Sequence, residues 1–231
     1  MDLSVLIPAR NEVWLAKTIE DILQNSRAET EVIAVLDGAW ADPEVTDNPR
    51  VRLTHSAGVI GQRAAVNLAA RMSRAQYVMK LDAHCMVAEG FDVELIKAAK
   101  ELGPEVTQIP QMRNLHVFDR RCLVCGREFY QGPMVVSCAD AAKALQLEPN
   151  GCTAVAAFDR VMRWRPRPGS RTVSWRFDHD LHFQYFPEYK NRPEARGEIA
   201  DTMSSVGACF FMERDRFKAL GGLDEAHGSW G

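Results

Sequence analysis

The sequence predicts an α/β protein with a mostly parallel central sheet and helices on both faces of that sheet. Over the first hundred residues, short apolar runs that suit buried strands alternate with stretches whose apolar residues recur at helical spacing. Alternation at this spacing is typical of parallel sheets, because each helix carries the chain back to the edge where the next strand begins. Polar residues directly follow three of the runs, and α/β sheets bind ligands beyond the carboxyl ends of their strands.

The first two elements are a strand over residues 3–8 and a helix that opens near Asn11. One apolar face indicates the helix, and it is formed by Leu15, Ile19, Ile22 and Leu23. The patterns that follow predict strands at 31–36, 51–54 and 77–81, and helices at 61–73 and 91–102.

The alternation ends near residue 115 and returns near residue 206. A buried strand is predicted over 206–212, and after it a short helix over 214–220 that stops at Gly221. The intervening stretch holds four of the six cysteines and an arginine-rich run. We therefore expect a single domain over residues 1–231, with an insertion at about 115–171.

Composition places the chain among ordinary globular proteins, with 46% hydrophobic and 26% charged residues and a net charge of −3. This balance excludes a general attraction to nucleic acid or anionic membrane and leaves room only for a local basic patch. No apolar run reaches the length of a bilayer span, and the first residues lack the pattern of a signal peptide. We expect a cytoplasmic protein whose cysteines are thiols or metal ligands rather than disulfides.

The triplet Asp82-Ala83-His84 follows the predicted strand at 77–81. In extended backbone, side chains two positions apart share a face, so Asp82 and His84 can bind one cation together. A carboxylate with an imidazole suits Mn²⁺, or Mg²⁺ in its place, and such ions hold nucleoside diphosphates at this edge of α/β proteins. Asp-x-His triplets also occur by chance, so the site hypothesis depends equally on the polar residues at 8–11 and at Asp37-Gly38.

Four short blocks together carry a resemblance to a known family. They are residues 4–12 (SVLIPARNE), 35–38 (VLDG), 81–85 (LDAHC), and 207–211 (GACFF) with its continuation at 221–225 (GGLDE) and 230–231 (WG), and residues 177–183 (FDHDLHF) match more weakly. In this order the blocks resemble the family 2-type glycosyltransferases of GT-A fold, most of all the polypeptide N-acetylgalactosaminyltransferase-like branch. The resemblance implies transfer of a sugar from a nucleoside diphosphate, with UDP the expected nucleotide, to a hydroxyl acceptor.

The resemblance also implies roles for individual residues. Asp37 would accept a hydrogen bond from uracil, although Asp37-Gly38 is equally good turn chemistry, and Asp82 with His84 would hold Mn²⁺ against the diphosphate. The residues expected to bind the nucleotide sugar are Pro8, Ala9, Arg10, Glu12, Asp37, Arg63, Asp82, Gly207, Ala208 and Trp230. In the family, the general base lies past the segment that matches Trp230. We therefore expect the catalytic base beyond Gly231, in a chain truncated at its C-terminus that binds donor more readily than it turns over.

The segment Cys122-Leu123-Val124-Cys125-Gly126 has the spacing of half a zinc site, with two thiolates placed to bind one ion. Cys138 and Cys152 can complete a four-thiolate site, although they form no knuckle of their own. A structural Zn²⁺ and reduced free thiols both fit this pattern, and so does redox chemistry.

Residues 160–176 carry six arginines, two tryptophans and no acidic residue. Arginine interleaved with tryptophan can bind phosphates and stack on bases, and a solvated loop fits equally. A nucleic-acid acceptor, such as a modified base, therefore stays open beside polysaccharide and protein acceptors.

Two other classes of function compete with the glycosyltransferase hypothesis. A sugar nucleotidyltransferase also uses carboxylates and a divalent ion, but the loop after the first strand has no glycine to hold a triphosphate. The second is a non-enzymatic, zinc-stapled module on a degenerate transferase fold, which would bind nucleic acid or another partner. Neither the Walker nor the Rossmann glycine pattern occurs in the sequence.

Overall fold

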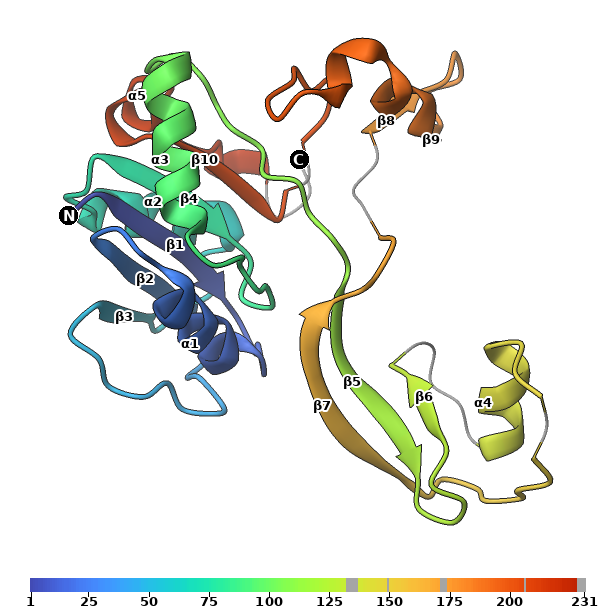
Figure 1. Cartoon of the computed structure of the whole chain (residues 1–231). Coiled ribbons are helices and arrows are strands. Elements are labelled where there is room, and N and C mark those ends of the chain that lie inside the picture. The colour runs from blue at the N-terminus through green and yellow to red at the C-terminus, as the bar shows by residue number, and fades with distance from the viewer. Residues whose placement is uncertain (132–136, 149, 171–173, 206, 228–231) are drawn as a thin grey trace. The chain divides into compact units, whose positions relative to one another are not determined.

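The computed structural model describes the chain except for residues 132–136, 149, 171–173, 206 and 228–231. The chain folds as two compact units, shown in Figure 1. Met1–Gln111 with Thr172–Gly231 form the larger unit, and Met112–Arg171 form the smaller one. Among the described helices, none has the length and apolar character that a bilayer span requires.

The larger unit is built on a five-stranded sheet with the strand order β10-β4-β1-β2-β3. Its strands are β1 (Leu3–Ala9), β2 (Thr30–Asp37), β3 (Val51–Ser56), β4 (Tyr77–Leu81) and β10 (Cys209–Glu213). The first four are parallel to one another, and β10 runs antiparallel to β4. The expected mostly parallel sheet is therefore confirmed.

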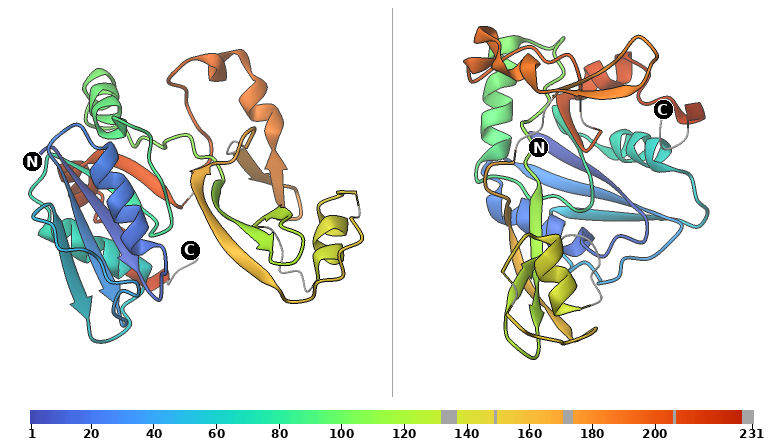
Figure 2. Two further views of the ribbon diagram at one scale, coloured as in Figure 1. Left: turned by 60° about the horizontal axis from the view of Figure 1, so that its bottom comes forward. Right: turned by 90° about the vertical axis from the view of Figure 1, so that its right-hand side faces the viewer.

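Helices cover both faces of this sheet, as Figures 1 and 2 show. They are α1 (Leu15–Asn25), α2 (Gln62–Met72), α3 (Phe91–Leu102) and α5 (Arg214–Ala219). Residues of α2 and α5 pack against Leu6, Ile33 and Val35 on one face, while α1 and α3 lie on the other. Neighbouring residues of β1 point to opposite faces, and Val5 and Leu6 are both fully buried, as a strand covered on both sides requires.

The first helix begins at Leu15 and not near Asn11, as the sequence had suggested. Asn11 has a φ of 51°, a left-handed backbone conformation that cannot form part of a right-handed helix. Residues 10–14 therefore form a loop at the carboxyl end of β1. This loop places Arg10 and Glu12 at the edge of the sheet.

A hairpin precedes the last strand of the larger unit. It pairs β8 (Ser174–Phe177) with β9 (Phe183–Phe186), and two short 3-10 helices follow, η1 (Pro187–Asn191) and η2 (Pro193–Arg196). A third, η3 (Glu225–His227), follows α5. His182 lies in the turn of the hairpin, with 73% of its side chain exposed.

The smaller unit contains a three-stranded antiparallel sheet and one helix. The strands are β5 (Leu115–Cys122), β6 (Glu128–Tyr130) and β7 (Phe158–Pro166), in the order β6-β5-β7, and the helix is α4 (Cys138–Ala144). The core of this unit is small and centres on Cys122, Phe129, Cys138 and two alanines of α4. The sequence predicted no elements here, because short antiparallel strands beside so small a core leave little periodicity to detect.

Asp92, in the first turn of α3, ties this helix to the loop between α1 and β2. Its fully buried carboxylate accepts hydrogen bonds from the backbone N–H groups of Arg27 and Ala28 and from the hydroxyl of Thr30. Burial alone raises the pKa of Asp92, but these hydrogen bonds outweigh it and hold the pKa below its usual value. The ionised carboxylate therefore stabilises the fold above the pKa of the unfolded chain, and this contribution is lost as pH falls through the folded-state pKa.

We expect Asp92→Asn to lower the free energy of unfolding by about 2–3 kcal/mol near neutral pH, because an amide cannot accept all of these hydrogen bonds. The difference in unfolding free energy between this variant and the wild type should become smaller as the pH falls below the range in which carboxyl groups ionise. Urea unfolding across pH measures both effects. Glu94→Gln, an exposed change in the same helical turn, is the control and should cost less than about 0.5 kcal/mol. Equal losses in the two variants would contradict this role of Asp92.

Candidate active site and metal centres

Three polar segments predicted from the sequence lie at the carboxyl edge of the parallel strands. The loop at 10–14 follows β1, Asp37 is the last residue of β2, and Asp82 directly follows β4. Because β1 lies between β2 and β4 in the sheet, these three strand ends are neighbours. The fold therefore brings the segments to one edge, the place where α/β sheets bind ligands.

Asp37 is buried, and it holds the backbone that leads into α2. Its Oδ1 accepts a hydrogen bond from the N–H of Ile60 at 2.6 Å, and its Oδ2 accepts one from the N–H of Gly61 at 3.1 Å. Both hydrogen bonds reach a segment 23 and 24 residues away, while Gly38, at a φ of 76°, allows the turn that follows β2. Each carboxylate oxygen keeps a second lone pair, which a nucleobase N–H can use.

Asp82 forms an ion pair that the sequence analysis missed. The nearly fully buried ammonium group of Lys80 contacts the carboxylate of Asp82 and also the carbonyl oxygen of Gly207. Gln62, the first residue of α2, donates to the same carboxylate oxygen at 3.2 Å. The sequence did contain a signal for this ion pair. Lys80 lies inside an apolar strand, two positions before Asp82, and side chains two positions apart in a strand point to the same face.

His84 contacts Glu12, and none of its described hydrogen bonds or ion pairs involves Asp82. Its Nδ1 lies 2.8 Å from Oε2 of Glu12. Because β4 ends at Leu81, Ala83 and His84 lie in a turn, and strand alternation does not place the imidazole as the sequence argument assumed. The hydroxyl of Thr18 in α1 donates to the carbonyl of Ala83 and fixes this turn.

The turn before β10 is held against Asp82. The backbone N–H of Asp82 donates to the carbonyl of Ala208 at 3.0 Å, while Lys80 donates to Gly207. Two of the residues expected to approach the donor sugar, Gly207 and Ala208, therefore lie beside the expected metal ligand.

Several other predicted site residues occupy the same edge. Pro8 and Ala9 end β1, and Arg10 is exposed in the loop that follows. Arg63 lies in the first turn of α2, with its Nη1 3.5 Å from the carbonyl oxygen of Asp224. Trp230 lies outside the described residues.

The segment after α5 is docked on α2 through Asn67, which the sequence analysis did not single out. The side chain of Asn67 donates to the carbonyl of Leu223 and accepts from its N–H, and it also donates to Glu225. Gly222 has a φ of 74°, and a Cβ there would lie 2.6 Å from Oδ1 of Asn67, so only glycine fits. These contacts hold residues 222–225 against the middle of α2.

Two ligand atoms at this edge are suited to a divalent cation. Within the described residues, Oδ2 of Asp82 accepts no hydrogen bond, since Lys80 and Gln62 both use Oδ1. Glu12 contacts Nδ1 of His84 through its carboxylate, so Nε2 is left to bind a metal ion. Histidines that bind metals usually have such a carboxylate on their other ring nitrogen. The donor set fits Mn²⁺ or Mg²⁺, with oxygens of a bound diphosphate and water completing the coordination.

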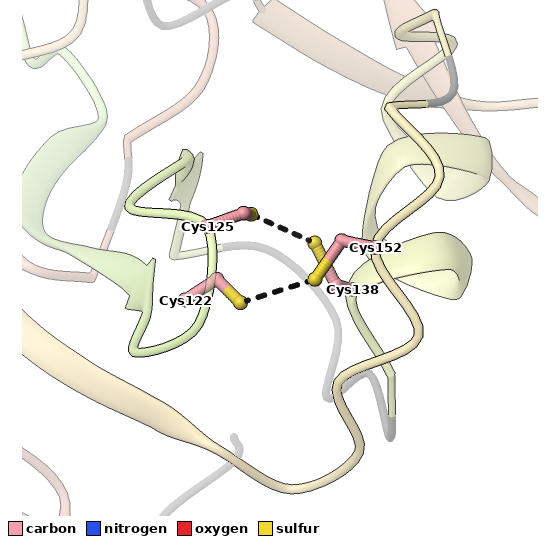
Figure 3. Close-up of side chains that lie close together, drawn as sticks. All are labelled: Cys122, Cys125, Cys138 and Cys152. Atoms are coloured by element: carbon pink, nitrogen blue, oxygen red, sulfur yellow. Dashed lines mark hydrogen bonds between the residues drawn. The ribbon is translucent and has the colours of Figure 1, made fainter.

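Four cysteines converge in the smaller unit, as Figure 3 shows. The sulfur atoms of Cys122, Cys125, Cys138 and Cys152 all lie within 4.8 Å of one another. Cys122 and Cys152 are 3.8 Å apart, and Cys125 and Cys138 are 3.6 Å apart, distances too long for disulfide bonds. Cys138 and Cys152 lie close together because the N–H of Cys138, at the start of α4, donates to the carbonyl of Ala154, two residues after Cys152.

The thiols of this cluster differ in acidity. The backbone N–H of Arg127 and the side-chain amide of Asn150 lower the pKa of Cys125 to about 6, while burial raises the pKa of Cys138 to about 12. Without an ion, the cluster therefore combines a thiolate with a thiol that resists ionisation. A coordinated cation would favour the thiolate form of all four.

A second group of candidate ligands lies in the turn between β8 and β9, formed by Asp178, Asp180 and His182. The carboxylate of Asp178 accepts hydrogen bonds from the backbone N–H groups of Asp180 and His182. These hydrogen bonds lower the pKa of Asp178. Stabilisation of the turn accounts for the arrangement.

Comparison with known proteins agrees with the fold described above. The profile of the family described as "Glycosyl transferase family 2" matches residues 4–120, just over half of the chain. A search of curated protein sequences finds no significant match. Among solved structures, the chain is similar to the crystal structure of GalNAc-T7 with UDP, GalNAc and Mn²⁺, at a TM-score of 0.60 and 17% identity.

The GalNAc-T7 match covers 100% of this chain and 38% of that one, so the chain spans well under half the length of this relative. A crystal structure of residues 1–349 of TarS from S. aureus in complex with UDP matches at a TM-score of 0.39 and 14% identity, over 55% of this chain and 43% of that one. The likeness to GalNAc-T7 confirms the GT-A fold that the sequence blocks implied.

We expect Lys80→Met to lower the free energy of unfolding by about 2–3 kcal/mol, because the variant leaves the partly buried Asp82 carboxylate without its counter-charge. Adding Asp82→Asn should recover part of this loss, since the double variant has no unpaired charge. Urea unfolding of the single and double variants measures the coupling. Lys97→Met, at an exposed position of α3, is the matched control and should change stability little. A double variant less stable than Lys80→Met would show that the ion pair is not what stabilises this strand end.

Proposed function

The chain belongs to glycosyl transferase family 2, and we propose that it transfers a sugar from UDP, or another nucleoside diphosphate, to a hydroxyl acceptor. The observation that carries the proposal is the shared edge of β1, β2 and β4. There, Asp37 and the Lys80–Asp82 ion pair flank the start of α2. Such an edge offers charged groups of both signs, together with the backbone N–H groups at the start of a helix.

We assign the donor site to this edge. Pro8, Ala9 and Arg10 would line the nucleoside, and Asp37 would accept a hydrogen bond from the base. The first turn of α2 carries the positive end of the helix dipole together with Arg63, and both favour the diphosphate. Gly207 and Ala208 leave room for the donor sugar beside Asp82, and Trp230 would close over it.

Asp82 and His84 are the proposed ligands of Mn²⁺ or Mg²⁺. Lys80 and Gln62 hold one oxygen of Asp82 and leave the other toward the ion, and Glu12 orients the imidazole of His84. When bound, such an ion neutralises charge on the departing diphosphate. Lys80 adds a second fixed positive charge at the same strand end.

We assign no general base within the described residues. Asp37 and Asp82 each already accept hydrogen bonds from neighbouring groups, and Glu12 holds His84. We propose one catalytic domain in which Met112–Arg171 form an insertion. The cytoplasmic location stays a prediction from the sequence.

We expect the chain to bind UDP in calorimetric titrations, more tightly with Mn²⁺ than without. Asp82→Asn and His84→Ala should each abolish most of the Mn²⁺ enhancement, because each removes one ligand of the ion. A tenfold or greater loss is the expected size. His179→Ala, which removes an exposed histidine of the β8–β9 turn, should leave the enhancement unchanged. If the wild type binds UDP equally tightly with and without Mn²⁺, the proposed metal site is refuted. If it does not bind UDP at all, the proposed donor site is refuted.

We also propose that the four cysteines of the smaller unit bind a structural Zn²⁺. Zinc–sulfur bonds of about 2.3 Å in a tetrahedron place neighbouring sulfurs about 3.8 Å apart. The observed separations of 3.6 and 3.8 Å match that spacing. Gly126, at a φ of 71°, permits the tight turn after Cys125, and the N–H of Arg127 bonds its sulfur.

We expect purified protein to contain about one zinc ion per chain, measured by elemental analysis. Cys125→Ser should reduce the zinc content to near zero, while Cys85→Ser, a thiol of the larger unit, should leave it unchanged. Because the core of the smaller unit is small, chelation should also expose this unit to limited proteolysis. Protein that contains no zinc and takes up none under reducing conditions would show that the cysteines are free thiols.

A further inference from the structure

Lys80 is a charged residue in an otherwise apolar position of the larger unit. In the sheet register its neighbours are Leu6 of β1 and Phe210 of β10. Leu6 and Val78, which share its face of the sheet, belong to the apolar core under α2. Transfer of an ammonium group from water to such a place is costly in free energy, so the presence of a lysine here needs a reason.

Stability alone does not supply that reason. A buried ion pair can often be replaced by apolar residues of similar volume without loss of stability, because the cost of removing both charges from water is then avoided. An apolar side chain at position 80 would also extend the core beside Leu6. What a buried ion pair provides instead is a fixed geometry. The role of Lys80 should therefore lie in the groups that it holds in place.

The ammonium group of Lys80 joins two segments at the carboxyl edge of the sheet. It contacts the carboxylate of Asp82 after β4 and the carbonyl oxygen of Gly207 before β10. The backbone N–H of Asp82 donates to the carbonyl of Ala208 at 3.0 Å, so the two segments lie side by side. Lys80 thus holds the turn formed by Gly207 and Ala208 against Asp82.

The donor site proposed above gives this turn a defined neighbour. In that site the base lies at Asp37 after β2 and the diphosphate lies at Asp82 after β4, with β1 between the two strands. The sugar is joined to the far end of the diphosphate, and β10 is the next strand beyond β4. The sugar would therefore lie over the start of β10. There, Gly207 is exposed, and among the described residues no atom lies within 4 Å of a Cβ added to it.

A direct contact between Lys80 and the diphosphate is the simplest competing explanation, because ammonium groups bind phosphates well. However, only 4% of the Lys80 side chain is exposed. Two of the three hydrogen-bond donors of its ammonium group reach Asp82 and Gly207. A buried ammonium group directed at protein oxygens acts on a ligand through the groups that it holds.

We propose that Lys80 is a positioning residue for the donor sugar, and this inference rests on the proposed function. By fixing the turn of Gly207 and Ala208 relative to Asp82, it determines how tightly the site binds the sugar part of the donor. The base and the diphosphate depend on Asp37 and on the start of α2, which Lys80 does not contact in the described structure. Loss of Lys80 should therefore weaken binding of a sugar nucleotide more than binding of the nucleotide alone.

The test compares UDP with four sugar nucleotides, UDP-glucose, UDP-galactose, UDP-GlcNAc and UDP-GalNAc, in calorimetric titrations of the full chain at saturating Mn²⁺. The sugar nucleotide that the wild type binds most tightly is the probe. Lys80→Met should weaken binding of the probe at least about tenfold and binding of UDP less than about threefold. Lower stability alone cannot change the ratio of the two affinities, because a smaller folded fraction reduces both by the same factor.

Two further variants support the interpretation of this ratio. Gly207→Val fills the open space beside the turn and should also weaken the probe at least about tenfold, with less than about a threefold effect on UDP. Asp92→Asn is the control, because it lowers stability from the opposite edge of the sheet, where Asp92 contacts Thr30 at the start of β2, and it should leave the ratio unchanged. If Lys80→Met does not fold, Lys80→Gln takes its place and should shift the ratio in the same direction.

Three results would overturn the role of Lys80. Equal weakening of UDP and the probe by Lys80→Met would mean that Lys80 acts on the diphosphate or the metal ion. A ratio that changes in Gly207→Val and not in Lys80→Met would mean that the sugar lies beside the turn without depending on Lys80. An unchanged ratio in Gly207→Val would mean that the sugar lies elsewhere.

The wild type separates this inference from the proposed function. A wild type that binds UDP but none of the four sugar nucleotides refutes the role of Lys80 and keeps the nucleotide site. A wild type that binds no UDP refutes the donor site, and the inference about Lys80 with it.

Discussion

The ion pair between Lys80 and Asp82 connects the elements that form the candidate donor site. Lys80 is buried within β4, and its ammonium contacts Asp82 beyond that strand and Gly207 before β10. Gln62 brings the start of α2 to the same carboxylate. One buried charge thus fixes a strand end, a helix start and a turn, because an unpaired ammonium at this depth would be strongly unfavourable. It also explains how Asp82 can present a single oxygen toward a cation.

The two units depend on different physical means of stability. The larger unit buries apolar residues on both faces of a parallel sheet, and this suffices for a stable core. The smaller unit has few buried residues, and its strands carry charges on both faces. A four-cysteine cluster lies next to that small core. An ion bound there would supply stability that the few buried apolar residues do not provide.

Much of the candidate site could be predicted from the sequence, because its residues follow strand ends that short apolar runs reveal. Asp37 and Asp82 were found in this way, and both lie where parallel strands end. Lys80 was missed because it sits inside an apolar run and its role appears only through its contact with Gly207. The strand argument that placed His84 beside Asp82 was wrong, because His84 lies in a turn after β4 and contacts Glu12, a residue far away in sequence. Its role as a metal ligand stays a proposal.

By itself, the sequence determined the parallel sheet, its helices and the Cys122–Cys125 pair, since local periodicity and spacing encode these features. Only the tertiary structure decided which groups meet across long separations. It placed Cys138 and Cys152 beside the first pair, set Arg120 opposite Arg160, and closed Glu12 on His84. Strand register and side-chain packing fix such pairings, and neither leaves a periodic trace along one chain.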